Sequence, residues 1–219
     1  MDQIERQRES AGDSSDAIHR TVLEAAQPRR GLSWLDIGCG TGDVLRLVAE
    51  RYEPTSLAGI DIIDWLADDL RDRVAMHVGP AEETARTIEP VDRVLLVETM
   101  EHLEAPWAVL RAAASAVRPG GVLVLSTPNI ATLRHRLELL TTGRLTSFRP
   151  DNAPHLQPVL PHVAARVLAD EGLEPGPLRY AHPDMLPKAP GRLWPAWAAR
   201  RWPRLACISV IVTASLPRS

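Results

Sequence analysis

The chain has 219 residues, of which 45% are hydrophobic and 24% charged, as expected for one soluble domain with a buried core. Its formal net charge of −3 gives no global basic surface for a duplex, so we do not expect nucleic acid as a partner. No apolar run has the length of a membrane span.

The first part of the chain alternates short apolar runs with helical patterns. Residues 1–13 are expected to form an arm, and Ser14 or Ser15 could cap a helix that ends before residue 30. Strands are predicted over residues 32–37, 56–62, 74–78, 91–97 and 121–126, and helices from residue 44, over 65–71 and over 107–117. Continuous apolar strands alternating with helices indicate a parallel sheet covered on both faces.

The pattern changes after residue 129. Residues 130–165 contain a basic helical stretch, a break at Gly143 and a loop with prolines, and we interpret them as an insertion over the strand ends within a single domain, residues 1–219. A helix over 163–171 and strands over 178–181 and 206–214 follow. Residues 192–204 are rich in Trp and Arg and could lie on a membrane surface or form a packed lobe; their prolines favour packing.

The cysteines bear on the cellular compartment. Cys39 and Cys207 are far apart in sequence and form no disulfide framework, and the polar N-terminus lacks the apolar stretch of a secretory signal. We therefore expect a cytoplasmic protein. The sequence does not indicate an oligomeric state.

The strongest motif is LDIGCGTG, residues 35–42, directly after the first predicted strand. Glycines let the backbone approach a ligand closely, and the next helix begins with free N–H groups. Dinucleotide enzymes also use such a turn, but their third glycine is replaced here by Asp43, whose charge would repel a pyrophosphate. Asp36 and Asp43 instead suit a ligand with a cationic end. A corner that binds no ligand would need only one of these glycines.

A carboxylate follows the second predicted strand. Asp61 stands nineteen residues after Gly42, where an acid can accept hydrogen bonds from both hydroxyls of a ribose. Asp64 is the near alternative. The sequence therefore predicts an adenosine-type ligand at this edge of the sheet.

A second polar group, ETMEH, follows the fourth predicted strand at residues 98–102. If this segment is helical, Glu98, Glu101 and His102 share a face at spacings i, i+3 and i+4. His102 could then be a general base, or the three side chains could hold a divalent cation that activates a hydroxyl. A role in packing and capping is the third interpretation.

The motifs LDIGCGTG, GIDI, VETMEHLE and RPGGVLVLSTPN, with the closing apolar strand, resemble class I S-adenosylmethionine-dependent methyltransferases. Within that group the chain looks closest to the ubiquinone-type and small-molecule O-methyltransferases. The resemblance implies a doubly wound α/β fold with seven strands, the last of them antiparallel. Its implied cofactor contacts are Asp36, Gly38, Cys39 and Gly40 for the methionine end, Asp61 and Ile62 for the ribose, Ala81 and Glu82 for the adenine, and also Val97. Many relatives have an acid where this chain has Pro80, so the adenine contact here falls to the backbone or to Glu82.

The Glu-x-x-Glu-His spacing is similar both to the ubiquinone-type O-methyltransferases and to the small-RNA 2′-O-methyltransferases, which use a metal. The resemblance implies methyl transfer to a hydroxyl of a small molecule, such as a sugar, a polyketide or a quinol-like ring. Asn129 and His155 are predicted to face this acceptor, although Asn129 could equally close a turn, and His162 is expected at the surface. An RNA 2′-O-methyltransferase and a non-catalytic partner protein with the same fold remain the alternatives.

Overall fold

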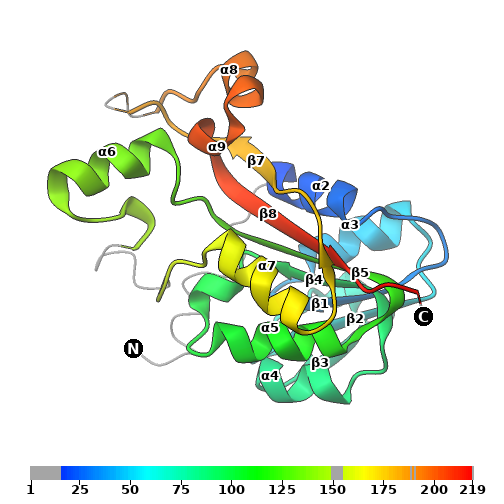
Figure 1. Cartoon of the computed structure of the whole chain (residues 1–219). Coiled ribbons are helices and arrows are strands. Elements are labelled where there is room, and N and C mark those ends of the chain that lie inside the picture. Colours follow the sequence, from blue (N-terminus) through cyan, green and yellow to red (C-terminus); the bar gives the residue numbers. More distant parts are fainter. Residues whose placement is uncertain (1–15, 149–154, 188, 190, 219) are drawn as a thin grey trace.

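The structure of the chain is a computed structural model, and it describes residues 16–148, 155–187, 189 and 191–218 (Figure 1). The expected N-terminal arm and its candidate caps, Ser14 and Ser15, lie outside these residues. The helix predicted after them is α2 (Asp16–Ala25), and it buries the apolar face formed by Ile18, Val22 and Leu23.

One sheet organises the described part of the chain. Its strands are β1 (Ser33–Ile37), β2 (Ser56–Asp61), β3 (Ala75–Val78), β4 (Val91–Val97), β5 (Val117–Pro128), β6 (Glu174–Pro175), β7 (Arg179–Pro183) and β8 (Cys207–Ser215). They follow the order β3-β2-β1-β4-β5-β8-β6, and β7 also pairs with β8. The first five strands are mutually parallel and β8 is antiparallel to β5. The predicted doubly wound fold with an antiparallel last strand is therefore confirmed.

The strand count differs from the expected seven, because the sheet has eight strands within the described residues. Two short strands, β6 and β7, share the position beside β8. β6 ends at Pro175, and Gly176 and Pro177 follow it before β7 begins. Proline cannot donate to a sheet ladder and glycine weakens a strand, so this edge is interrupted where a single strand was expected.

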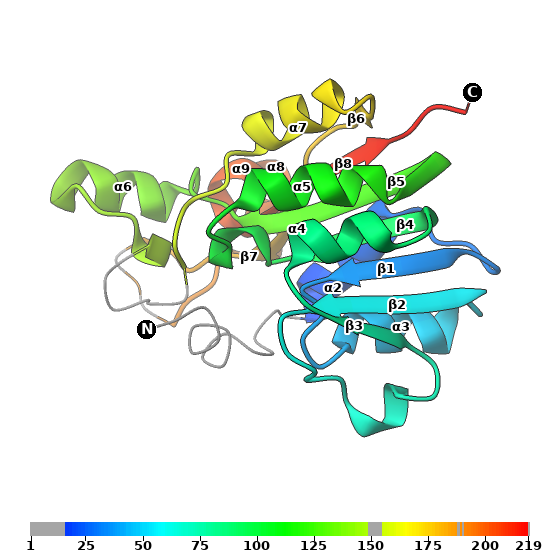
Figure 2. The ribbon, with the colours of Figure 1, turned by 90° about the horizontal axis from the view of Figure 1, so that it is seen from below.

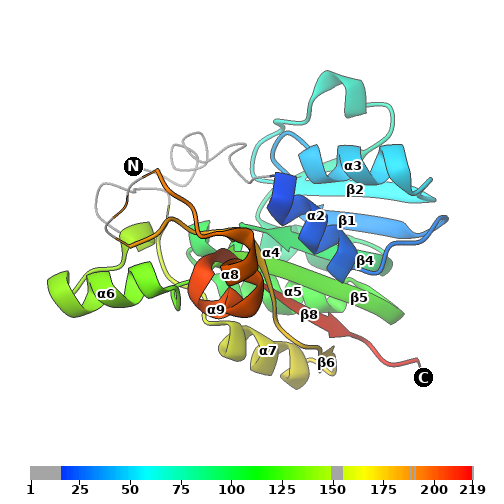
Figure 3. The same cartoon turned by 90° about the horizontal axis from the view of Figure 1, so that it is seen from above.

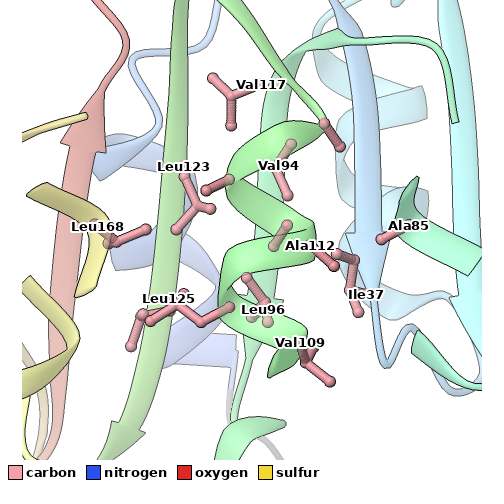
Figure 4. Packing of buried hydrophobic residues seen from close by; sticks show 14 of the residues in the cluster. Ile37, Ala85, Val94, Leu96, Val109, Ala112, Val117, Leu123, Leu125 and Leu168 are labelled. Carbon is pink, nitrogen blue, oxygen red and sulfur yellow. The ribbon is translucent and has the colours of Figure 1, made fainter. Parts of the chain in front are cut away.

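Helices cover both faces of the sheet (Figures 2 and 3). On one face lie α2 and α3 (Asp43–Arg51), which pack with Trp34 and Leu95 of the sheet. On the other lie α4 (Ala81–Thr84), α5 (Pro106–Ser115) and α7 (Pro161–Asp170). Figure 4 shows Leu96 and Leu125 of the sheet packed with Val109 and Ala112 of α5. Small alanine side chains let α5 lie close to the strands beneath it.

The prediction of a helix over residues 65–71 is wrong. Only a single 3₁₀ turn, η1 (Asp68–Leu70), forms there. Leu66 and Leu70 are buried over Gly42, and the N–H of Ala67 donates to the carbonyl of Thr41 at 3.2 Å. These contacts hold the segment as a loop folded onto the glycine turn, so tertiary packing overrides the local helical pattern.

The remaining helices lie toward the carboxyl ends of the parallel strands. α6 (Leu133–Thr142) extends away from the sheet in Figure 1. Thr132 caps its first turn, because its hydroxyl accepts the N–H of His135, and Gly143, with φ 70°, caps its end. The Trp- and Arg-rich segment forms two short helices, α8 (Ala196–Arg201) and α9 (Pro203–Ala206). Among the helices described, none combines the length and the apolar character needed to span a bilayer.

Candidate functional site

The strand order identifies one edge of the sheet as the place for a ligand. β1 lies between β2 and β4, so the chain runs outward in opposite directions from β1 and from β4. In open α/β sheets, ligands bind beyond the carboxyl ends of the strands at such a switch point. The glycine turn after β1 and the Glu-His segment after β4 both lie at this edge, which we call the carboxyl edge.

The glycine turn has three residues with positive φ: Gly38 at 77°, Gly40 at 51° and Gly42 at 86°. A Cβ on Gly38 would lie 2.4 Å from Cγ2 of Thr99, and one on Gly42 would lie 2.6 Å from Cδ1 of Leu70. Packing therefore requires these two glycines. A Cβ on Gly40 would meet no described atom within 4 Å. The turn is thus open beside Gly40, where a ligand can approach the backbone.

Asp61 joins this turn to the end of β2. One carboxylate oxygen accepts the N–H of Gly40 at 2.9 Å and the other accepts the N–H of Ile62 at 2.7 Å. Burial raises the pKa of this carboxyl, and the backbone donors oppose that shift. The alternative acid, Asp64, is exposed and accepts a hydrogen bond from Arg71 at 2.8 Å. Asp61 is therefore the acid that faces the glycine turn.

Asp36, the last residue but one of β1, is 2% exposed, and its Oδ1 has no hydrogen-bond partner among the described residues. Burial raises its pKa to about 7, and the charge of Asp61 adds to that shift. A buried carboxylate without a donor is costly unless a ligand supplies one. Together with the open side of Gly40, this acid fits the ammonium end of an amino-acid ligand.

Cys39 does not point toward this space. Its thiol lies in the core, with Sγ 3.7 Å from Sδ of Met76, and a Cβ on Gly59 would lie 2.7 Å from Sγ. Burial raises the pKa of the thiol. Only the backbone of Cys39 is available at the turn, where its N–H already donates to the carbonyl of Ile60 at 3.1 Å.

The residues expected to border an adenine lie at the same edge. Ala81 and Glu82 begin α4 and are partly exposed, and Val97, also partly exposed, ends β4. The N–H of Gly79, just before α4, donates to the carbonyl of Asp61 at 3.0 Å. This bond ties the start of α4 to the acid at the end of β2, but no contact tests the adenine role, which stays a prediction.

The segment after β4 differs from the expected helix. Glu98 has φ 50°, and only one 3₁₀ turn, η3 (Met100–His102), follows. The N–H of Glu98 donates to Oγ of Ser126 at 3.0 Å, and the hydroxyl of Thr99 donates to the carbonyl of Val97 at 3.1 Å. Because the chain turns sharply, Glu98, Glu101 and His102 do not share one helical face.

Two acids of this segment, Glu98 and Glu101, carry buried carboxylate oxygens. Glu101 is 0% exposed, and neither of its carboxylate oxygens has a hydrogen-bond partner in the described part of the chain; Oε1 of Glu98 is likewise buried without one. Burial raises the pKa of Glu98 to about 7, while the hydroxyls of Ser126 and Ser209 oppose the shift. The pKa of Glu101 is raised further, first by burial and then by the charge of Glu98.

The structure brings together a group that differs from the expected set of Glu98, Glu101 and His102. One ligand atom each of Glu101, His102 and His155 lies within 4.8 Å of the others, and Glu98 is not part of this group. The imidazole centroids of the two histidines are 4.8 Å apart, with 66° between their planes. This group differs from the expected set because it contains His155 of the insertion in place of Glu98, and cation binding itself stays a prediction.

One backbone and one side-chain hydrogen bond hold the loop next to His155 in this position. The N–H of Leu156 donates to the carbonyl of Glu101 at 2.9 Å, and Nε2 of Gln157 donates to the carbonyl of Leu103 at 2.9 Å. These bonds fasten the loop before α7 along η3. The sequence indicated His155 as an acceptor-side residue but did not show that it meets Glu101 and His102.

Asn129 is 3% exposed, and both polar atoms of its side chain make hydrogen bonds within the chain. Its amide donates to the carbonyls of Arg204 at 3.0 Å and Cys207 at 2.8 Å, and its carbonyl accepts the N–H of Ala131 at 3.0 Å. It therefore closes the turn after β5 and fastens it to α9 and β8. This geometry agrees with the alternative role as a turn residue, and the contact with the acceptor stays a prediction.

Three residues of the site were not singled out in the sequence. Thr99 packs against Gly38, Ser126 accepts the N–H of Glu98, and Ser209 lies beside Glu98 from the last strand. Ser126 lies in the quoted STPN motif and gave a weak signal. Ser209 gave none, because only the antiparallel pairing of β8 with β5 brings it there.

Comparisons with known proteins place the chain among methyltransferases. The sequence model of the family described as "Methyltransferase domain" matches residues 5–175. The ubiquinone biosynthesis O-methyltransferase of Azorhizobium caulinodans is 34% identical over 110 residues, which cover 47% of this chain and 43% of that protein. This chain spans about half the length of the curated relatives it matches.

Solved structures share the fold at low identity. The N-methyltransferase NodS of Bradyrhizobium japonicum, in complex with S-adenosyl-L-homocysteine, superposes with a TM-score of 0.65 at 15% identity, covering 99% of this chain and 98% of NodS. The [4+2]-cyclase SpnF superposes with a TM-score of 0.64 at 19% identity, covering 92% of this chain and 81% of SpnF. Because one neighbour is an N-methyltransferase and the other a cyclase, fold alone does not identify the acceptor atom.

Proposed function

The chain belongs to the methyltransferase-domain family of class I S-adenosylmethionine-dependent enzymes, and from this premise we propose that it methylates a hydroxyl of a small molecule. The observation that carries the proposal is the carboxyl edge. At this edge are an open glycine turn, a buried oxygen of Asp36 without a hydrogen-bond partner, and a group of two imidazoles and a carboxylate.

The residues of the turn fit the cofactor. Asp36 offers a buried carboxylate for the ammonium of the methionine end, and the backbone beside Gly40 is open to it. Asp61 presents its carboxylate at the turn, where the remaining lone pairs of its oxygens suit the ribose hydroxyls. Ala81 and Glu82, at the start of α4, then border the adenine.

When bound, S-adenosylmethionine would supply an electrophilic methyl group to the acceptor oxygen and would leave as S-adenosylhomocysteine, and the hydroxyl proton would pass to a base of the protein. The Glu101, His102 and His155 group stands next to the glycine turn, because Thr99, two residues before Glu101, packs against Gly38. Burial lowers the pKa of His155, so its imidazole is neutral near pH 7 and can accept a proton. This group is where the acceptor hydroxyl loses its proton.

Two considerations support a small hydroxyl acceptor. The group that can remove a proton suits an alcohol or phenol, and the ubiquinone-type relatives are named as O-methyltransferases. The net charge of −3 does not favour a nucleic acid. We propose a sugar, a polyketide or a quinol-like ring as the acceptor class. Cytoplasmic location stays a prediction, in keeping with two buried, free cysteines.

A transfer assay tests the proposal. The full chain is incubated with methyl-labelled S-adenosylmethionine and pairs of acceptors that differ only in a hydroxyl or an amine at one position. We expect label on the hydroxyl members of at least one class. Label on the amine members alone would contradict O-methylation while leaving methyl transfer in place.

A further inference from the structure

We propose that the Trp- and Arg-rich lobe, residues 185–206, is a docking surface for an anionic lipid bilayer. The lobe connects β7 to β8 and carries α8 and α9. In Figure 1 both helices lie beyond the ends of these strands and project away from the sheet. The inference goes beyond methyl transfer, because it uses none of the side chains proposed to hold the cofactor or to take the acceptor proton.

The first support is the way the lobe divides its side chains between inside and outside. Ala199 and Ala206 are buried in a small cluster, and Trp194 packs against it. The larger Trp197 and Trp202 are instead 63% and 45% exposed. A lobe that only packs, as its prolines led us to expect, would bury its tryptophans first, because they carry the most apolar area. Two of them remain outside, available to a partner.

The second support is that these two tryptophans form one patch with a cation beside it. Their ring centroids are 6.1 Å apart, with 63° between the planes, and Cζ of Arg201 lies 5.7 Å from the centroid of Trp202. Leu193 of the same lobe is also exposed. Tryptophan is enriched where a bilayer meets water, and an arginine at that level can reach the lipid phosphates. The patch has the composition of a surface that lies on lipid headgroups.

The third support is the charge of the lobe. Residues 185–206 contain five Lys or Arg and no Asp or Glu, whereas the rest of the chain contains 20 Lys or Arg and 28 Asp or Glu. Arg192, Arg200, Arg201 and Arg204 are exposed, and no ion pair among the described residues involves them. An anionic surface therefore attracts the lobe and repels the rest of the chain, which would turn α8 and α9 toward the lipid.

The patch favours lipid over the bases of a nucleic acid. Stacking of a base needs an open ring face, but Arg201 lies over the ring of Trp202, and the two tryptophans meet in an edge-to-face arrangement. Contact with lipid headgroups does not require a free ring face. Because α8 has only six residues, the lobe does not act as a long amphipathic helix, and it presents its tryptophans from a folded support.

The test is co-sedimentation of the full chain with vesicles of phosphatidylglycerol and with vesicles of phosphatidylcholine. We expect binding to phosphatidylglycerol that weakens with added salt, and at least about tenfold weaker binding to phosphatidylcholine. Brominated lipid in the bound vesicles should quench tryptophan fluorescence. Equal binding to both lipids, or no binding to phosphatidylglycerol, would overturn the proposal.

Two double variants locate the surface. Trp197→Ala with Trp202→Ala removes the apolar patch, and Arg200→Ala with Arg201→Ala removes two of the exposed charges. Each should weaken binding to phosphatidylglycerol vesicles at least about tenfold. The four side chains are exposed, so both proteins should keep the melting temperature of the unaltered chain, which reports that they fold. Unchanged binding in both variants would place the lipid contact elsewhere and overturn the proposal.

Matched controls come from exposed side chains outside the lobe. Leu178 is 41% exposed and lies just before β7, at the end of that strand away from the lobe, and Arg86 is exposed in the 3₁₀ turn η2 (Ala85–Thr87). Leu178→Ala and Arg86→Ala should bind vesicles as the unaltered chain does. A loss in the controls as large as in the double variants would show that binding is not specific to the lobe.

Two other occupants of the surface would give different results. Binding of a single-stranded RNA oligonucleotide without binding of phosphatidylglycerol vesicles would assign the lobe to a nucleic acid. In sedimentation velocity without lipid, a dimer that is lost in Trp197→Ala with Trp202→Ala, together with no vesicle binding, would assign the patch to a second copy of this chain. Either result overturns the proposal, and a monomer that binds the vesicles supports it.

Discussion

Buried charged residues differ in their hydrogen-bond partners between the two edges of the parallel strands. At the edge where the strands begin, Asp92 accepts hydrogen bonds from the N–H of Ser33 at 2.9 Å and its hydroxyl at 2.8 Å, and it also pairs with Arg118. Arg93 beside it donates to the carbonyls of Ala26, Asp92 and Gln27. Each of these two buried charges has several partners in the chain itself.

At the carboxyl edge, Asp61 has two backbone donors, but three other acids carry buried oxygens without a partner. Oδ1 of Asp36, Oε1 of Glu98 and both oxygens of Glu101 have no hydrogen-bond partner within the described residues. The same sheet carries both sets of buried charged residues, so burial alone does not explain the difference. Unsatisfied buried acids are costly, and their concentration at the edge where ligands bind indicates groups kept for a ligand and not for stability.

The largest expected effect is a loss of turnover from a substitution at the carboxyl edge. His102→Ala removes one member of the group that takes the acceptor proton, so kcat is expected to fall about 100-fold or more. The measurement is turnover with labelled cofactor, once an acceptor is known. Binding of S-adenosylhomocysteine should stay within about twofold, because the glycine turn is untouched. Full turnover in this variant would reduce His102 to a packing residue.

The next largest effect is a loss of stability from a substitution at the opposite edge, where the strands begin. Asp92→Ala removes the acceptor for Ser33 and the partner of Arg118, so the free energy of unfolding is expected to fall by about 2–3 kcal/mol. Urea unfolding measures this change. Affinity for S-adenosylhomocysteine should not change where the protein is folded. A weaker affinity for S-adenosylhomocysteine in the folded variant would contradict separate roles for the two edges.

A smaller effect concerns the acid at the glycine turn. Asp61→Ala removes an acceptor of the Gly40 N–H and the proposed ribose contact, so affinity for S-adenosylhomocysteine should weaken at least about tenfold, or about 1.4 kcal/mol. Asp64→Ala is the matched control, since Asp64 is exposed and pairs with Arg71. Calorimetry on both variants makes the comparison. Equal affinities would place the ribose elsewhere.

The smallest effect is a pH dependence of the ligand-free protein. The pKa of Asp36 is raised to about 7, so the folded state binds more protons than the unfolded state between about pH 4 and 7. Stability should therefore fall as pH rises through that window and level off above it. Asp36→Asn cannot ionise and should lose this dependence, which is at most about 1.4 kcal/mol per pH unit. Melting temperatures from pH 5 to 8 test it, and parallel curves for both proteins would contradict it.

The sequence predicted the fold well where local pattern and tertiary packing agree. The strand predicted over residues 91–97 became β4 with unchanged bounds, and the glycine turn lies after β1 as expected. It failed over residues 65–71, where Leu66 and Leu70 pack over Gly42 and suppress the helix. No local pattern reports such a contact across the fold.

The site was predicted in its parts but not in its grouping. Asp36, Gly40 and Asp61 could be named from one motif and one spacing, because a single β-α-β unit carries them. The Glu101, His102 and His155 group could not, because the loop bonds from Leu156 and Gln157 and the sharp turn at Glu98 decide which residues meet. Those bonds join segments far apart in sequence, which periodicity does not encode.

The most direct test of the account is calorimetric titration of S-adenosylhomocysteine into the unaltered chain and Asp36→Asn, at pH 7 in two buffers with different ionisation enthalpies. Asp36 is partly protonated there, and an ammonium beside it favours the ionised form, so binding should occur at one site with release of a fraction of a proton. The variant should bind more weakly and release none. Absence of binding by the unaltered chain at millimolar ligand would contradict the claim that the unpartnered acids of the carboxyl edge serve a cofactor.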